Sequence, residues 1–256
     1  MDFGFIIAGF LVGFLVGLTG VGGGSLMTPI LLLFFHIKPA FAVGTDLLYA
    51  SITKSVGIFA HGKLGNIDWR IVKLLAAGSV PASIATILFL RTINVESNEA
   101  ISTIKFSLGV ALIVTSAAVL LRTKLMKLLA TETLIPAPYV ASSTVLLGIV
   151  LGGLVTLTSV GAGALGVTAL IVLYPKKKIT TIIGSDIAHA VPLTLVAGLG
   201  HASLGTVDYS LLGTLLIGSI PGIYIGSHLS AKVAEHWIRI ALSAILIYVG
   251  LKLVMH

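Results

Sequence analysis

Charged residues are scarce in this chain of 256 residues, and cysteine is absent. Aspartate, glutamate, lysine and arginine together make up 10% of the sequence, whereas a soluble globular domain carries about 25%. Hydrophobic residues make up 57%, and the mean hydropathy is +1.12. So few charges cannot cover a surface that faces water. The composition therefore predicts an integral membrane protein with most of its length inside the bilayer.

The absence of cysteine excludes a disulfide framework, a thiolate metal site and a cysteine nucleophile. Two enzyme motifs are also missing: the His-Glu-x-x-His zinc motif and the Gly-x-Ser-x-Gly nucleophile turn. The glycine-rich stretch near the start of the chain lacks the lysine of a phosphate-binding loop. We therefore expect no enzymatic activity, no cofactor and no metal site.

Ten apolar segments divide the chain, and most approach the roughly 20 helical residues that cross a bilayer. Two of them, 25–36 and 163–174, are short for a crossing. The predicted fold class is all-α, a polytopic membrane protein. The predicted segments are 3–19, 25–36, 41–60, 69–90, 100–121, 138–157, 163–174, 180–199, 209–229 and 236–254.

The two halves of the chain are copies of each other. Adding 140 to a position in the first half gives a like residue in the second half. Aspartate, histidine and proline are scarce here, so these matches are not expected by chance. The matching blocks are Gly44-Thr45-Asp46 with Gly184-Ser185-Asp186, His61 with His201, Gly65–Trp69 with Gly205–Tyr209, and Gly78–Pro81 with Gly218–Pro221.

We predict a first transmembrane repeat over residues 1–128 and a second over 138–256, joined by a linker at 122–137 within one transport domain. An odd number of segments in each half predicts repeats that are inverted across the membrane. If the first two segments of each half form a re-entrant hairpin, the parity is unchanged. Only a single bent crossing would make the repeats parallel.

The basic residues predict an orientation. Eleven of the sixteen lysines and arginines fall on one side of the ten segments, including Lys176, Lys177 and Lys178. The positive-inside rule puts this side in the cytoplasm and both termini outside, and a re-entrant arrangement predicts the same sidedness. The other five are Lys38, Arg91 and Lys252 near segment ends and Lys54 and Lys105 within segments.

Glycine clusters interrupt the apolar runs at matching places in the two halves, 20–24 and 159–163. Each glycine costs a helix about 1 kcal/mol relative to alanine. The clusters favour broken helices whose second parts offer free N–H groups to an anion, and close packing through small residues is the alternative. The predicted substrate-binding residues at the breaks are Thr19, Gly20, Gly22, Gly23, Gly24, Ser25, Thr158, Ser159, Gly161 and Gly163.

Asp46 and Asp186 lie a turn or more inside apolar segments, where an acid is costly and usually marks function. Favourable placement near a helix N-terminus is the alternative. Lys54 follows Asp46 by eight residues, and Thr194 replaces it in the second half. This lysine could bind an anion or pair with an acid, or it could reach the membrane edge. Thr45, Asp46, Lys54, Ser185 and Asp186 complete the predicted substrate-binding set.

The other repeated polar residues have structural interpretations beside functional ones. Asp68 and Asp208 precede aromatic residues where helices restart, so we expect them to be N-caps. His61 and His201 fall at segment ends, where a histidine can bond free carbonyls or act in gating or proton handling. Pro81 and Pro221 fall inside segments, where proline kinks a helix, and we include them among the candidate gating residues.

This pattern resembles the TauE/SafE family of sulfite exporters over nearly the whole chain. Its most specific part is the run from Thr19 to Ser25 followed by Gly44-Thr45-Asp46. The resemblance implies export or uptake of small sulfur-containing anions such as sulfite, thiosulfate or organosulfonates. The second half departs from the pattern, because Ala162 stands where a full cluster would carry glycine.

Two classes of function compete. The first is a multi-pass transporter of the plasma or inner membrane that moves small oxyanions by alternating access, with the anion held between the two breaks. The second is a passive anion pore or a membrane scaffold without a transport cycle. The expected partners are the anion and the lipid bilayer, and nucleic acid is not needed to explain the net charge of +7. Valine at Gly22 or Gly161 should cut anion affinity and largely spare folding, with Gly78→Val as the control.

Overall fold

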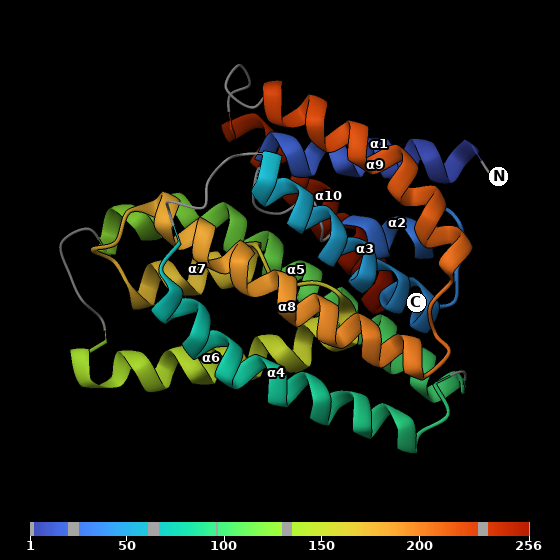
Figure 1. Cartoon of the computed structure of the whole chain (residues 1–256), viewed down its shortest axis with the longest axis horizontal. Coiled ribbons are helices and arrows are strands. Elements are labelled where there is room, and N and C mark those ends of the chain that lie inside the picture. The colour runs from blue at the N-terminus through green and yellow to red at the C-terminus, as the bar shows by residue number, and fades with distance from the viewer. Residues whose placement is uncertain are drawn as a thin grey trace.

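The computed structural model describes residues 3–19, 26–60, 67–95, 97–129, 135–229 and 235–255. These ranges hold ten helices and no strand (Figure 1). The predicted all-α class is confirmed. The helices are α1 (Phe3–Thr19), α2 (Met27–Leu33), α3 (Pro39–Ala60), α4 (Trp69–Thr92), α5 (Asn98–Leu129), α6 (Ala137–Thr158), α7 (Ala164–Leu173), α8 (Ile179–Ser203), α9 (Tyr209–Leu229) and α10 (Glu235–Met255).

Each predicted segment corresponds to one helix, and the bounds of α1 and α9 agree with the predicted ones. The largest difference is in α5, which continues to Leu129. Residues 122–129, predicted as the start of the linker, are therefore helical, and Arg122 is buried. The helix continues past Arg122 because most of the residues that follow, leucine and lysine among them, favour a helix. Neither glycine nor proline interrupts them.

Five helices among the described residues are long and apolar enough to cross a membrane: α4, α5 up to Arg122, α6, α8 and α9. By contrast, α2 and α7 have 7 and 10 residues, which is about 10 and 15 Å of helix. Neither can span a hydrocarbon core about 30 Å thick. Large apolar side chains such as Phe106, Leu146 and Tyr224 lie exposed on the outer helices, as expected of a surface that faces lipid.

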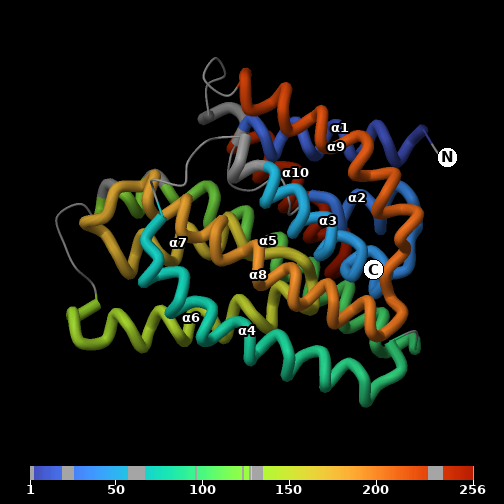
Figure 2. The backbone as a smooth tube through the Cα atoms, in the orientation of Figure 1, coloured from blue at the N-terminus to red at the C-terminus, as the bar shows by residue number. Residues whose placement is uncertain are grey.

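The chain turns back on itself at α7. In Figure 2 the tube runs inward along α6 and returns along α7, so that the start of α6 and the end of α7 lie at the same end of the molecule. The start of α1 and the end of α2 lie together at the opposite end, where both termini also lie. With the short lengths of α2 and α7, this arrangement favours re-entrant hairpins over full crossings.

Helices of one half pack on helices of the other. The pair α1 and α9 forms one edge of the molecule and the pair α4 and α6 forms the opposite edge, with α3 and α8 between them (Figure 1). In the register of 140 residues, α1 corresponds to α6 and α9 to α4. The two edge pairs are therefore equivalent, as expected if the halves are related by a two-fold axis.

Glycines let the edge pairs approach until the backbones touch. Gly9, Gly13 and Gly17 of α1 lie against the carbonyl oxygens of Leu215, Ser219 and Ile223 in α9. A Cβ atom at any of these glycines would overlap the facing backbone. Spacings of four residues between small side chains are typical of helix pairs in membranes.

The same contact occurs between α4 and α6, where Gly78 meets the carbonyl oxygen of Val145. The expectation that Gly78→Val would be a harmless control is therefore wrong. Gly78 is a packing glycine, whereas nothing lies within 4 Å of a Cβ atom at Gly213. Gly213 is the better control position.

Hydrogen bonds also cross between the halves in equivalent pairs. The N–H of Asp68 donates to Ser185 Oγ at 2.8 Å, and the N–H of Asp208 donates to Thr45 Oγ1 at 3.0 Å. Near the middle of α3 and α8, Ser51 Oγ donates to the carbonyl of Val191 at 3.4 Å, and these two residues are themselves 140 positions apart. An axis relating the halves would pass between α3 and α8 at this contact.

Candidate functional site

The break between α6 and α7 has a backbone that helices do not adopt. Ser159 has a φ of 58°, Gly161 of 122° and Gly163 of 115°. Glycine adopts such angles freely, whereas other residues pay for them, so Ser159 is the unusual member. Its side chain is buried beside Asp46, and its hydroxyl makes no hydrogen bond of regular geometry to a described residue. A strained, buried hydroxyl beside an acid is the kind of feature that functional sites carry.

Asp46 lies on α3 and faces the first turn of α2. It is fully buried, and its Oδ2 accepts hydrogen bonds from the N–H of Thr28 at 3.1 Å and from Thr28 Oγ1 at 2.5 Å. The positive end of the short helix thus receives a carboxylate of the protein itself. Its other oxygen, Oδ1, makes no hydrogen bond of regular geometry to a described residue.

Asp186 lies in the equivalent place on α8 and faces α7. It is fully buried, and neither carboxylate oxygen makes a hydrogen bond of regular geometry to a described residue, although the backbone of Gly163 at the break interacts with it. Its Oδ1 lies directly against Gly166, where a Cβ atom would overlap it. The two acids therefore sit beside the short helices that follow the two breaks, an arrangement that the local sequence around either acid does not indicate.

Lys54 links the first half to the second break. It leaves α3 two turns beyond Asp46, and its Nζ donates to the carbonyl of Ala162 at 3.2 Å. Its ammonium also interacts electrostatically with both Asp46 and Asp186. The predicted residues Asp46, Lys54, Ser159, Gly161, Gly163 and Asp186 are thus gathered around one break.

Two buried side chains near the acids were missed by the sequence analysis. His189 follows Asp186 by three residues, and its Nε2 is 2.7 Å from Ser79 Oγ on α4, while Nδ1 has no partner among the described residues. Tyr49 follows Asp46 by the same interval and is fully buried. Both could have been found from their spacing, because residues three apart share a helix face.

Other predicted residues are occupied in holding the fold. Thr45 and Ser185 accept the hydrogen bonds that cross between the halves. Thr158 donates to the carbonyl of Leu154 at 2.7 Å and accepts from the N–H of Val160 at 3.1 Å. These three hydroxyls shape the site more directly than they offer donors to a ligand.

His201 lies in the last turn of α8 and bridges to α6. Its Nδ1 is 2.9 Å from Thr206 Oγ1, and its Nε2 is 3.0 Å from the carbonyl of Thr156. Because a carbonyl only accepts, Nε2 carries a proton. The expected bonding to free carbonyls is confirmed, although the bonded carbonyl belongs to α6 instead of the end of α8. Pro81 and Pro221 lie inside α4 and α9, as predicted.

Several predicted site residues lie outside the described residues or have side chains that are not described. The side chain of Thr19 is not described, although its backbone ends α1. The remaining ones are Gly20, Gly22, Gly23, Gly24, Ser25 and His61. The roles predicted for them stay predictions.

The two remaining aspartates are N-caps, as predicted. Asp68 Oδ1 accepts from the N–H of Arg70 at 2.9 Å, and Asp208 Oδ1 accepts from the N–H of Leu211 at 2.9 Å. Asp68 also forms an ion pair with Lys177 in the turn between α7 and α8, with 2.5 Å between Nζ and Oδ2. The hydrogen bond from Lys177 holds the pKa of Asp68 below its usual value.

The site is thus a lysine and a buried hydroxyl beside a broken helix, with one buried acid from each half. Among the described residues, no group of three or more histidine and acidic side chains could hold a metal ion. A family model described as "Sulfite exporter TauE/SafE" matches residues 5–253. The chain belongs to this family.

Relatives of this TauE/SafE protein carry transporter names. It is 41% identical to "Probable membrane transporter protein YjnA" of Bacillus subtilis, over 99% of this chain and 100% of the relative. It is 29% identical to "Probable membrane transporter protein MJ0441" of Methanocaldococcus jannaschii, over 96% and 92% of the two chains. No solved structure matches it. The protein is therefore a multi-pass member of a family of membrane transporters, which is not an enzyme family.

Proposed function

We propose that this protein carries small sulfur-containing oxyanions, such as sulfite, thiosulfate or an organosulfonate, across the cell membrane by alternating access. The family description supports an anion of this class. The observation that carries the proposal is the position of Lys54, whose ammonium reaches from α3 to the break between α6 and α7. A basic side chain at this depth needs a function to offset its cost.

The groups around Lys54 suit an oxyanion. A buried anion needs several donors, because an isolated charge in an apolar medium is far costlier than a neutral polar group. Lys54 supplies a positive charge, and Ser159 supplies a buried hydroxyl that an anion would share with Asp46. The first turn of α7 follows at once and places the positive end of a helix beside them.

The two acids supply a means of alternation. Asp46 and Asp186 come from different halves and both interact with Lys54. An anion that binds Lys54 competes with these carboxylates and displaces one of them electrostatically. In our proposal, rocking of the halves about the contact between α3 and α8 moves Asp186 toward or away from Lys54, whereas Asp46 stays on the same helix as Lys54, and the anion is exposed to one side or the other.

Flux in proteoliposomes tests the proposal. We expect saturable uptake with counterflow for at least one anion of a panel of sulfite, thiosulfate and ethanesulfonate. The variant Lys54→Thr gives the first half the threonine that the second half has at the matching position. It should lower this flux at least tenfold, since a charge-assisted hydrogen bond contributes about 1.5–3 kcal/mol. Lys73→Gln, at an exposed position of α4, is the control and should leave the flux unchanged.

Ser159→Gly gives a second test that does not disturb the fold. Glycine accepts the left-handed backbone of this position, so the variant should be at least as stable as the wild type while it loses the hydroxyl. We expect weaker anion binding with normal expression. Flux that rises linearly without saturation would instead support a passive pore, and wild-type flux in Lys54→Thr would remove the proposed site.

A further inference from the structure

A second group of basic side chains lies at the end of the molecule that holds both termini. A pocket of about 260 Å³ opens there between the turn joining α2 to α3, the start of α5 and the end of α10. Its basic residues are His36, Lys38, Lys105 and Lys252, and none of the described residues that line it is acidic. The remaining lining residues are Leu32, Leu33, Ile37, Pro39, Ile101 and Leu253, all apolar.

The lysines of this pocket do not lie on the side of the membrane where most basic residues are predicted. Most basic residues fall on the side predicted to be cytoplasmic, and only five do not. Three of those five line this one pocket. Lys105 and Lys252 are like charges at one pocket, so their gathering costs free energy unless an anion joins them.

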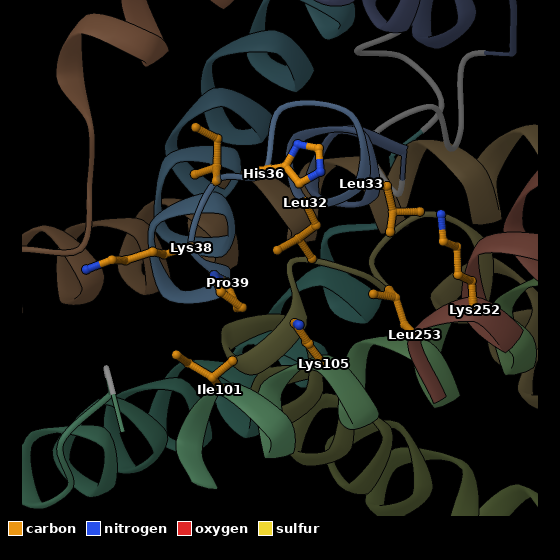
Figure 3. Close-up of a pocket in the computed structure, with 10 residues that line it drawn as sticks. Leu32, Leu33, His36, Lys38, Pro39, Ile101, Lys105, Lys252 and Leu253 are labelled. Carbon is orange, nitrogen blue, oxygen red and sulfur yellow. The ribbon is translucent and has the colours of Figure 1, made fainter. Parts of the chain in front are cut away.

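The side chains are arranged toward the cavity. Figure 3 shows Lys105 and Lys252 on the side that faces Leu32 and Leu33, whereas Lys38 extends away. Neither Lys105 nor Lys252 has a hydrogen bond or ion pair to another described residue, and Lys105 is half-buried. His36 enters from a left-handed turn with a φ of 53°, which is closed by the N–H of Ile37 donating to the carbonyl of Leu31 at 3.0 Å.

We propose that this pocket binds a tetrahedral oxyanion, a sulfonate or a phosphate, that is attached to an apolar chain. The ammonium groups of Lys105 and Lys252 would hold the oxyanion, and the leucine and isoleucine side chains would cover the apolar part. The volume is just below the usual range for pockets that hold drug-sized ligands. It therefore suits a short alkanesulfonate or the headgroup of an anionic phospholipid, which share this chemistry.

The pocket is separate from the site at Lys54, and the inference does not depend on transport. It lies at the C-terminal end of α2, whereas Asp46 is bound at the first turn of that helix. The pocket is therefore separated from the Asp46 carboxylate by about the length of α2, about 10 Å. A free anion held here would wait beside the buried site, and a lipid headgroup would fix α2, α5 and α10 to one another.

Titration calorimetry of the full chain in a non-ionic detergent tests the proposal. The probes are sodium sulfate, butane-1-sulfonate and dihexanoyl phosphatidylglycerol, with dihexanoyl phosphatidylcholine as the probe without net charge. We expect butane-1-sulfonate or the phosphatidylglycerol to bind, and to bind more weakly as the salt concentration rises. Binding of butane-1-sulfonate alone would identify a free organic anion as the ligand, and binding of phosphatidylglycerol alone would identify a lipid; either supports the shared oxyanion chemistry.

Variants decide whether the lysines are responsible. Lys105→Gln and Lys252→Gln should each weaken binding about tenfold, and the double variant should abolish it. His36→Gly keeps the left-handed turn and should weaken binding less, because the backbone is retained and only the imidazole is lost. Lys73→Gln lies outside the pocket lining and should bind as the wild type does.

The variant Lys54→Thr distinguishes binding in the pocket from binding at the buried site. The pocket should still bind its probe in that background, whatever the effect on flux. Absence of binding by all charged probes would overturn the inference. Equal binding of the phosphatidylcholine, or unchanged affinity in the double lysine variant, would equally overturn it.

Discussion

Aspartates of identical chemistry serve opposite purposes in this molecule because of what surrounds them. Asp68 is held by two backbone N–H groups and by Lys177 at the edge of the protein. Asp186 is fully buried, and neither of its oxygens makes a hydrogen bond of regular geometry to a described residue. A group that is satisfied stabilises the fold, whereas one that is buried and unsatisfied is retained at a cost that function must offset.

We therefore predict that Asp46→Asn and Asp186→Asn lower anion flux at least tenfold at equal expression. The amide keeps the shape and removes the negative charge that, in our proposal, displaces the anion from Lys54 so that it can be released. Asp68→Asn and Asp208→Asn should lower flux less than threefold, because asparagine also caps a helix. Flux in proteoliposomes measures the difference. Equal losses in all four variants would contradict the division into functional and structural acids.

The ion pair between Asp68 and Lys177 predicts a dependence of stability on pH. Lys177 holds the pKa of Asp68 below its ordinary value of 3.8. The stabilisation is therefore complete above about pH 4 and is lost as the pH falls through the lowered pKa. Because the lysine is 42% exposed, the effect should be no more than about 1 kcal/mol.

Thermal unfolding in detergent from pH 7 to pH 3 measures this effect. Asp68→Asn keeps the cap but not the ion pair, so the difference in stability between the wild type and the variant should shrink as the pH falls below 4. A difference that stays constant over this range would show that the ion pair contributes nothing.

At the scale of the helices, glycine decides how closely neighbours approach. The glycines at the contact of α1 with α9 lie against facing carbonyls, and so do those at the contact of α4 with α6. These contacts are alike at the two edges, so they set the distance between the halves as well as between the helices. Close approach increases dispersion contacts where no hydrophobic driving force exists between helices in lipid.

We predict that Gly13→Val and Gly78→Val each destabilise the fold by about 3 kcal/mol, the upper part of the range for overpacking. Gly213→Val, where nothing lies within 4 Å of the added Cβ atom, should leave the stability unchanged. Retention as a single peak in size-exclusion chromatography and the midpoint of thermal unfolding report the difference. Wild-type stability of Gly13→Val would show that α1 and α9 do not pack as described.

The backbone at the break between α6 and α7 makes Gly161→Val unsuitable as a test of function alone. Gly161 has a φ of 122°, so a valine there is strained regardless of the space around it. The expectation that Gly161→Val would largely spare folding is therefore wrong. Ser159→Gly, in which the backbone angle is retained, separates function from folding at the same break.

At the scale of the whole molecule, the two termini lie at one end, and the end of α5, the start of α6 and the turn after α7 lie at the other (Figure 1). This arrangement agrees with the predicted topology, in which both termini are outside and the basic turns are cytoplasmic. Because the chain has no cysteine, single cysteines can report each end separately.

We predict that a cysteine at Lys252 reacts with a membrane-impermeant maleimide added to intact cells, and that a cysteine at Lys177 reacts only after the cells are opened. Both side chains are exposed enough for labelling. Labelling of the Lys177 position in intact cells, without labelling at Lys252, would reverse the orientation.

Local patterns in the sequence were sufficient to predict the helices and, for most of them, bounds within a few residues. Glycine, proline and the length of apolar runs act on the nearest few residues, and a repeated pattern carries the same local preferences twice. The burial of Asp46 and Asp186 and the capping by Asp68 and Asp208 could also be predicted locally, because the position of each residue within its own helix decides its role. The extension of α5 past Arg122 could not be predicted, since a helix end is set by weak preferences that several residues share.

The composition of the candidate site depends on how the halves dock. Lys54 meets Ala162, which is 108 positions away, and Asp68 meets Ser185 through a bond that joins the halves. No local pattern specifies such contacts, because they follow from backbones that approach through glycine faces on distant helices. The pocket at Lys105 and Lys252 has the same origin: its lysines come from two helices that are adjacent in space and far apart in the chain.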